Sequence, residues 1–264
     1  MTLLEVPPLS ELPPPSWSTS QLRTLGRAIK NGTEDEHSGR GGPNYVDVLQ
    51  YFDTLASATL VAIADLDWES LVHDRPPPLI TARAKTIDTL RAKLRRDPRF
   101  PLQQVHDLAG VRFEAEMSLN EQDLVAMAIC SAFGCPLSAI ADLRTSPRSG
   151  YRAVHIKLEL PHGRVEVQVR THMQGAWANT YEAAADVLGR GIRYGELPRT
   201  EIDRDFVYRM QRLSVETGAV LEQLRQRFQD SGQATPAALL EHERRYTLAL
   251  SEVEQRLRTL GRME

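Results

Sequence analysis

Side chains able to do chemistry alternate along residues 150–171, which the pattern predicts to be a β-hairpin with a tight turn at residues 161–163. Successive side chains of a strand point to opposite faces. Valine, isoleucine and leucine therefore gather on one face, which packs on a core. The other face carries Tyr151, His155, Glu166, Gln168 and Arg170. This set favours a ligand-binding face, with a plain solvated face as the alternative.

The segment that precedes the predicted strands is rich in positive charge. Between positions 81 and 104, seven Lys or Arg residues accompany only two acidic residues. We interpret residues 82–96 as one helix, because Ile87, Leu90 and Leu94 share a side at about 100° per residue. The opposite side carries Lys85, Thr89, Lys93 and Arg96. This face is either a solvated helix surface or, given its place beside the strands, an anion site.

The composition of the chain limits the classes of protein to which it can belong. The chain has 264 residues and a net charge of −3, so no general affinity for polyanions is implied and any basic site must be local. Cys130 and Cys135 form neither a disulfide framework nor a zinc site, and we expect both in a core. The N-terminus does not resemble a signal peptide, and no run approaches a membrane span. A cytoplasmic protein is predicted.

The remaining elements indicate an α+β fold, with a mixed sheet flanked by helices. A further strand is predicted at Gly110–Glu116, and helices near 44–72, 119–133 and 172–188. Two long helices, near 199–229 and 235–262, close the chain. We therefore divide it into a flexible arm (1–16), a main domain (17–197) and a C-terminal helical region (198–264).

Four stretches resemble the synthetase domain of RelA/SpoT-type alarmone synthetases, and they occur in that family's order. They are Arg83-Ala84-Lys85…Thr89…Lys93, Asp107-Leu-Ala-Gly-Val-Arg112, Pro147-Arg148-Ser149-Gly150-Tyr151…His155 and Val165-Glu-Val-Gln-Val-Arg-Thr171. The resemblance implies a nucleotidyltransferase-like synthetase fold. It also implies a small, stand-alone enzyme without the hydrolase and regulatory domains of the longer members.

The activity implied is transfer of pyrophosphate from ATP to the 3′-hydroxyl of GDP or GTP, which makes (p)ppGpp. Asp107 and Glu166 would hold Mg²⁺ and, with Lys93, act in catalysis. Residues matching the family's ATP side are Arg83, Lys85, Thr89 and Lys93. Residues matching its guanine-nucleotide side are Arg112, Arg148, Tyr151, His155, Gln168 and Arg170. Tyr151 would stack on guanine, and we expect Gly150 to let the base approach.

Departures from the family pattern leave other functions open. Residues 114–143 contain no Arg or Lys, where the resemblance places a second adenine-stacking arginine. We therefore expect weak ATP binding, or an arginine from elsewhere such as Arg91 or Arg95. Tyr181 and Glu182 stand where the family tends to carry Glu and His.

Two alternative functions follow from the same residues. One is a related toxic synthetase that pyrophosphorylates tRNA or another nucleotide, since the basic segment could hold a nucleic-acid backbone. The other is a weak or inactive nucleotide-binding member of the family. The apolar spacing of the last helix also permits a homo-oligomer.

Overall fold

The computed structural model describes residues 7–37, 42–72, 75–97, 101–147 and 149–261. Its five-stranded sheet has the order β1-β2-β5-β4-β3, in which β2 and β5 run parallel and the other neighbours antiparallel. The strands are β1 Leu79–Ala84, β2 Ala109–Ala115, β3 Ile140–Asp142, β4 Val154–Leu160 and β5 Gly163–Thr171. The predicted α+β class with a mixed sheet is confirmed.

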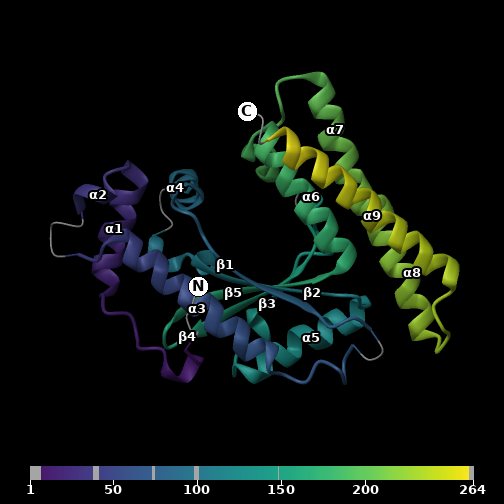
Figure 1. The fold of residues 1–264 in the computed structure, drawn as a ribbon, viewed down its shortest axis with the longest axis horizontal. Helices are drawn as coiled ribbons and strands as arrows, with labels where there is room; N and C mark the ends of the chain where they lie inside the picture. Colours follow the sequence, from purple (N-terminus) through teal and green to yellow (C-terminus); the bar gives the residue numbers. More distant parts are fainter. Residues whose placement is uncertain (1–6, 38–41, 73–74, 98–100, 148, 262–264) are drawn as a thin grey trace.

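Helices cover both faces of the sheet (Figure 1). They are α1 Thr19–Asn31, α2 Glu34–His37, α3 Tyr45–Ala64, α4 Ile87–Arg96, α5 Leu119–Ala132, α6 His172–Leu188, α7 Glu201–Arg212, α8 Ala219–Asp230 and α9 Ala237–Leu260. One face packs against α3 and α5, and α6 contacts the other face through β2 and β5. A short helical segment, η5 Arg190–Tyr194, follows α6.

The alternation of apolar and polar residues determines which face of the hairpin is buried. Val165, Val167 and Val169 of β5 are completely buried, and the residues between them reach the opposite face. The valine face packs against α3 and α5 in a core that we call the sheet core. Burial of apolar surface thus orients the polar residues of β4 and β5 toward α6.

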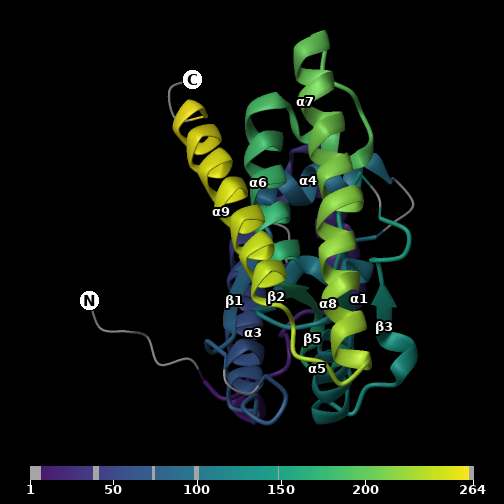
Figure 2. The ribbon, with the colours of Figure 1, turned by 90° about the vertical axis from the view of Figure 1, so that its right-hand side faces the viewer.

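The C-terminal helices form a second core with α6, which we call the helical core. Its apolar members include Trp177, Val207 and Leu250. Helices α7 and α8 are joined through a π-helical turn at Leu213–Gly218, so they form one rod beside α9 (Figure 2). The predicted helices near 199–229 and 235–262 agree with these elements, apart from the turn between α7 and α8.

Three local predictions from the sequence are wrong. Residues 82–84 belong to β1, because the backbone of this segment pairs with β2 and overrides its helix propensity, so α4 begins only at Ile87. The helix predicted over 44–72 ends at Ala64. Cys130 and Cys135 form a disulfide, although Cys130 is also buried as expected.

Part of the predicted N-terminal arm packs on the domain. Leu12 is buried in the sheet core, and the Tyr51 hydroxyl donates a hydrogen bond to the Pro13 carbonyl. Within the described residues, α3 is the helix long and apolar enough to cross a membrane by length and composition, a weak indication that core helices also give. Helix α3 contacts β1, β2 and β5, as a core helix does.

Candidate active site

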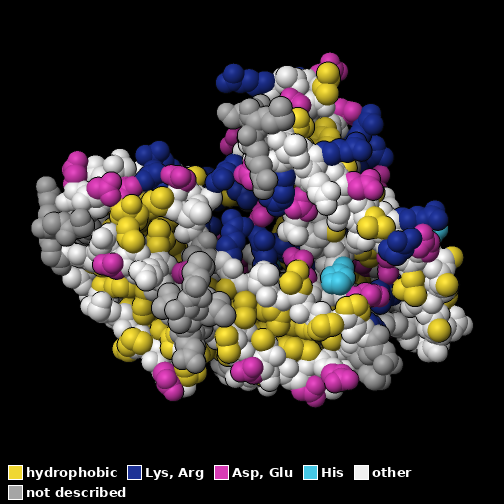
Figure 3. Space-filling view, in the orientation of Figure 1, with side chains coloured by type: hydrophobic (Ala, Val, Ile, Leu, Met, Phe, Trp, Pro, Cys, Tyr) yellow, Lys and Arg dark blue, Asp and Glu magenta, His cyan; other side chains and the backbone are white. Residues whose placement is uncertain are grey.

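A cavity of about 430 Å³ lies between the polar face of the sheet, α4, α6 and η5. The space-filling view shows Lys and Arg side chains gathered in a hollow at this place (Figure 3). A pocket of this size is suited to a small-molecule ligand. The excess of cations on its walls selects for an anionic one.

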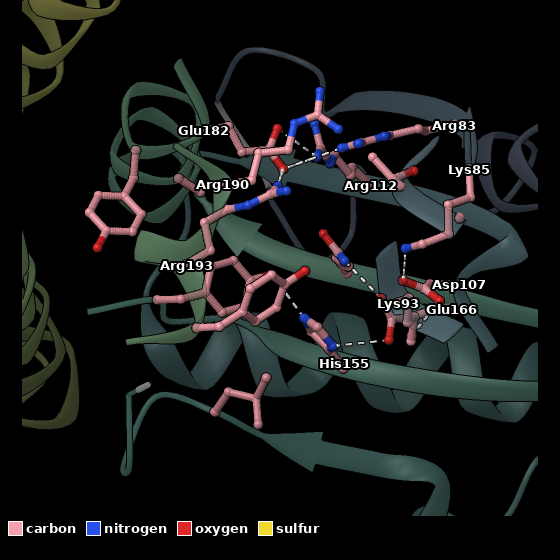
Figure 4. Close-up of a pocket in the computed structure, with 18 of the residues that line it drawn as sticks. Arg83, Lys85, Lys93, Asp107, Arg112, His155, Glu166, Glu182, Arg190 and Arg193 are labelled. Carbon is pink, nitrogen blue, oxygen red and sulfur yellow. Dashed lines mark hydrogen bonds and ion pairs between the residues drawn. The ribbon is translucent and has the colours of Figure 1, made fainter. Parts of the chain in front are cut away.

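Asp107 lies at one end of the pocket, just before β2, between two lysines (Figure 4). Lys93 of α4 donates a hydrogen bond to Asp107 Oδ1 at 2.6 Å, and Lys85 donates to Oδ2. Burial opposes ionisation of this carboxyl, but Lys85 and Lys93 outweigh it and lower the pKa of Asp107. Asp107 is therefore ionised at neutral pH.

A chain of hydrogen bonds crosses the floor of the pocket through β4 and β5. The Tyr151 hydroxyl lies 2.8 Å from His155 Nε2, and His155 Nδ1 lies 3.4 Å from Glu166 Oε1. Gln168 Nε2 donates to Glu166 at 2.8 Å, and Arg170 donates to the Tyr151 oxygen at 3.0 Å. Cross-strand pairing of His155 with Gln168 sets these side chains beside one another.

The titratable members of this chain have shifted pKa values. Burial would raise the pKa of Glu166, but His155 and Gln168 lower it to about 2. Burial would lower the pKa of His155, but Tyr151 and Glu166 raise it to about 9. Burial likewise disfavours the charged form of Tyr151, and Arg170 and His155 outweigh it to lower the pKa of the phenol. The floor thus carries an ionised Glu166 and a protonated His155 near neutral pH.

A cluster of arginines lies across the pocket from these strands (Figure 4). Arg83 of β1 and Arg112 of β2 donate hydrogen bonds to Glu182 of α6, at 3.2 and 3.0 Å. Arg193 of η5 approaches the same carboxylate at 3.8 Å. Burial opposes ionisation of Glu182, but Arg112 and Arg83 outweigh it and lower the pKa of Glu182.

The structure brings the candidate site residues together from four separate stretches of the chain. All of them line this pocket except Arg148, which lies outside the described residues. Arg83, Lys85, Thr89 and Lys93 come from β1, α4 and their connection. Their convergence is a fact of the geometry, and their individual roles remain predictions.

The structure does not support Arg91 or Arg95 as the second arginine beside adenine. Arg91 contacts Glu34 and Asp88, and Arg95 donates to the Lys30 carbonyl, so both are held by groups outside the pocket lining. Arg112 instead lies beside Arg83, because the two side chains share Glu182. A second guanidinium therefore stands next to Arg83 without any contribution from residues 114–143.

Sequence reasoning did not assign several residues that line the pocket. They are Glu182, Arg190, Arg193 and Tyr194. Arg96, which the sequence placed on the candidate anion-binding face, lies 3.5 Å over the Tyr194 ring. The run Arg190-Gly-Ile-Arg-Tyr194 between two glycines was the available signal, since it combines two cations and an aromatic ring.

The structure gives Gly150 a reason other than the approach of a base, which stays a prediction. A side chain there would clash with the Trp177 ring at 2.8 Å and with Gln211, so close packing of α6 and α7 excludes it. The φ of 83° at Gly150 is itself a conformation that favours glycine. Gly150 therefore positions Tyr151 through packing, and the base need not approach the glycine.

The donor set fits a magnesium ion. Asp107 and Glu166 are ionised carboxylates in one pocket, and carboxylate oxygens are suitable ligands for Mg²⁺. Lys93 contacts Asp107 and also lowers the pKa of Glu166, so a cation already lies near both carboxylates. Within the described part of the chain, no group of three or more His, Cys, Asp or Glu is arranged to bind a metal. Phosphate oxygens of a nucleotide would have to complete the coordination.

Comparison with known proteins shows a similarity that includes most of this pocket. Residues 82–186 match the family model described as a region found in RelA / SpoT proteins. This part of the chain is similar to the RelA/SpoT region. It contains the end of β1, all of β2 to β5 and nearly all of α6, and therefore most of the pocket. The resemblance drawn from the four sequence stretches is confirmed.

The similarity of the chain to known relatives covers more residues than this region does. It is 44% identical over 184 residues to uncharacterized proteins of Mycobacterium tuberculosis and Mycobacterium bovis. The match covers 70% of this chain and 64% of each relative, which is less than two thirds of their length. These relatives support common descent and carry no statement of activity.

Solved structures of small alarmone synthetases share the fold. Small alarmone synthetase 1 of Bacillus subtilis aligns with a TM-score of 0.52 at 19% identity, over 71% of this chain and 96% of its own. Small alarmone synthetase 2 of the same organism gives 0.53 at 16%, over 72% and 100%. At these identities the comparison supports the architecture of the RelA/SpoT region.

Proposed function

We propose that this protein is a (p)ppGpp synthetase, which transfers pyrophosphate from ATP to the 3′-hydroxyl of GDP or GTP. The observation that carries the proposal is one pocket in which two ionised carboxylates face a wall of lysines and arginines. Phosphoryl transfer depends on positioning and on neutralising the charge of the moving group, and this wall supplies both. The solved complex of B. subtilis small alarmone synthetase 1 with its product pppGpp has the same fold, with a TM-score of 0.53.

The donor side would lie along β1 and α4. Lys85 and Lys93 contact Asp107 in this structure, and their ammonium groups would turn to the phosphates of ATP. Arg83 and Arg112, which stand side by side, would flank the adenine ring through cation–π contacts. This proposal moves Arg112 from the guanine side, where the sequence resemblance placed it, to the donor side. This proposal therefore replaces the expectation of weak ATP binding with an adenine ring held on both faces.

The acceptor side would lie along β4 and β5. Tyr151 would stack on guanine, and His155, Gln168 and Arg170 would position the tyrosine and Glu166. Asp107 and Glu166 would hold Mg²⁺, which when bound would neutralise charge on the phosphates. A carboxylate with a pKa of about 2 is a weak general base, so Glu166 serves better by orienting the 3′-hydroxyl and holding the metal.

We keep three further assignments as parts of this proposal. The division into residues 1–16, 17–197 and 198–264 describes an arm, a synthetase domain and a helical region. Location in the cytoplasm follows from substrates that are found there. Pairing of two copies through the C-terminal helices would give a homo-oligomer.

One assay tests the function. Purified protein is incubated with labelled ATP, Mg²⁺ and either GDP, GTP or tRNA, and the products are resolved. We expect label in guanosine tetra- or pentaphosphate and an equal amount of AMP. Label in tRNA alone would support the alternative acceptor, and no transfer to any of the three would contradict the proposal.

A further inference from the structure

One hydroxyl group in the rod formed by α7 and α8 holds the chain on both sides of Tyr151. Ser214 Oγ donates a hydrogen bond to the Gly150 carbonyl at 2.6 Å and accepts one from Arg152 Nε at 3.2 Å. Gly150 and Arg152 are the residues immediately before and after Tyr151. Ser214 is only 1% exposed, so bulk water does not compete for these bonds. The backbone at Tyr151 is therefore held by a residue that lies far later in the chain.

The turn that Ser214 holds has an unfavourable backbone conformation. The φ angle is 52° at Ser149 and 83° at Gly150. A positive φ is uncommon for residues other than glycine, and it persists only where the surrounding structure enforces it. Ser149 and Tyr151 both line the pocket. Backbone strain of this kind gathers at ligand-binding sites, so the turn is a candidate for a conformation that is kept for binding.

The rod also holds this turn through Trp177 of α6. Trp177 Nε1 donates a hydrogen bond to the Met210 carbonyl of α7 at 2.7 Å, and its ring packs against Gly150. A Cβ placed on Gly150 would lie 2.8 Å from that ring and 3.1 Å from Gln211 Cα, so the turn is enclosed on both sides. Every residue of the rod is described, and none of them lines the pocket. The rod therefore acts on the pocket through the elements that it holds.

A buried ion pair orients the arginine that reaches Ser214. Glu222 of α8 is 2% exposed and accepts hydrogen bonds from Arg152 and from the Thr171 hydroxyl. Thr171 ends β5 and caps α6. Glu222 thus fixes the Arg152 side chain and the junction of β5 with α6 to the same point of the rod.

We propose that Ser214 is a positioning residue for binding of the acceptor nucleotide, and that the rod thereby completes the acceptor side of the pocket without entering it. The inference rests on the proposed function, in which Tyr151 stacks on guanine. Without the Ser214 hydroxyl, the buried Gly150 carbonyl loses this partner and the strained turn relaxes. The Tyr151 ring then loses the orientation that stacking requires.

The first test is isothermal titration calorimetry of the full chain with GDP. Ser214→Ala removes only the hydroxyl, and the net contribution of a hydrogen bond corresponds to about two- to tenfold in an equilibrium constant. We therefore expect the Kd for GDP to rise about two- to tenfold. Ser118→Ala is the matched control, because Ser118 is also 1% exposed and its hydroxyl caps α5 on the opposite face of the sheet. It should bind GDP as the parent does.

A double-mutant cycle shows whether Ser214 acts through Tyr151. If it does, Ser214→Ala should not weaken GDP binding further in a Tyr151→Ala background, because no ring is left to position. A residue that only stabilised the fold would lower GDP affinity by the same factor in both backgrounds. Arg152→Lys gives the same test if Ser214→Ala does not fold, since it keeps a cation for Glu222 and loses the bond to Ser214.

The outcomes separate this inference from the proposed function. Parental GDP affinity in Ser214→Ala, with an unchanged circular dichroism spectrum, overturns the inference even if the parent makes guanosine tetra- or pentaphosphate. An equal loss in both backgrounds overturns it too, and so does the absence of GDP binding by the parent. If the titrations behave as expected but the parent makes neither product, the positioning role stands and the proposed function fails.

Discussion

The sheet core consists mainly of leucine, isoleucine, valine and phenylalanine. The helical core, in contrast, adjoins buried charged side chains that form ion pairs with one another. Arg152 contacts Glu222 with only 5% and 2% of the side chains exposed, and Arg225 contacts Glu243 at 2.8 Å. Apolar burial needs no specific partner, but a buried charge does. The sheet core therefore tolerates small changes better than the helical core does.

The Arg152–Glu222 pair is also linked by hydrogen bonds to the loop that carries Tyr151 at the pocket. Arg152 follows Tyr151 in the chain and donates to Ser214, which donates to the Gly150 carbonyl at 2.6 Å. Ser214 lies in the π-helical turn between α7 and α8, a type of irregularity frequently found at functional sites. The C-terminal rod thus positions the loop that carries Tyr151, while the sheet positions Glu166.

The largest effect on activity should come from Glu166→Gln. This variant removes a charge that the sheet holds in the pocket, and the apolar sheet core does not depend on that charge. We expect transfer of pyrophosphate to fall about 10²–10⁴-fold, the range for a positioned catalytic group, with the fold retained. The labelled-ATP assay and circular dichroism measure the two effects. Full activity in the variant would remove Glu166 from the mechanism.

Arg152→Ala should be the most destabilising of these changes, because it leaves Glu222 buried without its partner. Breaking a buried ion pair costs about 3–5 kcal/mol of unfolding free energy, measurable by urea denaturation. Arg209→Ala, at a side chain that is 78% exposed, should change stability little. Ile156→Val in the sheet core should cost about 0.5–1.5 kcal/mol. Equal losses for Arg152→Ala and Ile156→Val would break the comparison of the two cores.

Two substitutions of Tyr151 distinguish the stacking of its ring on the nucleotide from the hydrogen bonds of its hydroxyl. Loss of base stacking is worth about 1–3 kcal/mol, so Tyr151→Ala should weaken guanine-nucleotide binding about ten- to a hundredfold. Tyr151→Phe keeps the ring and loses the hydroxyl contacts with His155 and Arg170. We expect it to bind the nucleotide nearly normally and to alter the pH profile of turnover. Calorimetry with GDP tests this, and parental affinity in Tyr151→Ala would exclude stacking.

The smallest effect expected is a pH dependence of stability that comes from the floor of the pocket. The pKa of His155 is raised from 6.5 to about 9, so its contribution is complete below pH 6.5 and is lost as the pH rises through 9. The pKa of Glu166 is lowered from 4.5 to about 2, so its contribution is complete above pH 4.5 and is lost as the pH falls through 2.

The melting temperature should therefore decline by a few degrees between pH 6.5 and 9, beyond the change seen in a variant without the pair. Glu166→Gln is that variant, because it removes the carboxylate that lies 3.4 Å from His155 Nδ1. Parallel melting curves for the parent and Glu166→Gln across this range would show that the pair does not contribute.

Much of the sheet could be predicted from the sequence alone. The alternation in β4 and β5 predicted both strands, their turn and the face that carries His155 and Glu166, because one buried face imposes a period of two on a strand. The same rule predicted β2. It failed for β1, whose six residues have no clear alternation and whose Ala and Arg residues favour a helix.

The site was only partly predictable. The four stretches of family resemblance identified every described candidate from Arg83 to Arg170, since those stretches carry their residue types at fixed spacing. They gave no indication of Glu182 as a shared partner or of Arg193, which lies in a short segment outside the motifs. An ion pair between residues 99 positions apart, such as Arg83 and Glu182, has no local signature.

By itself, the sequence determined the class of fold, the polar face of the hairpin and the set of groups able to handle phosphates, because periodicity and motif spacing are local properties. Only the tertiary structure decided which charges meet: Lys93 with Asp107, His155 with Glu166, and Arg83 and Arg112 with Glu182. The reason is physical. A charge in a partly buried pocket is stabilised by whatever opposite charge the packing brings within a few ångströms, and packing depends on the whole chain.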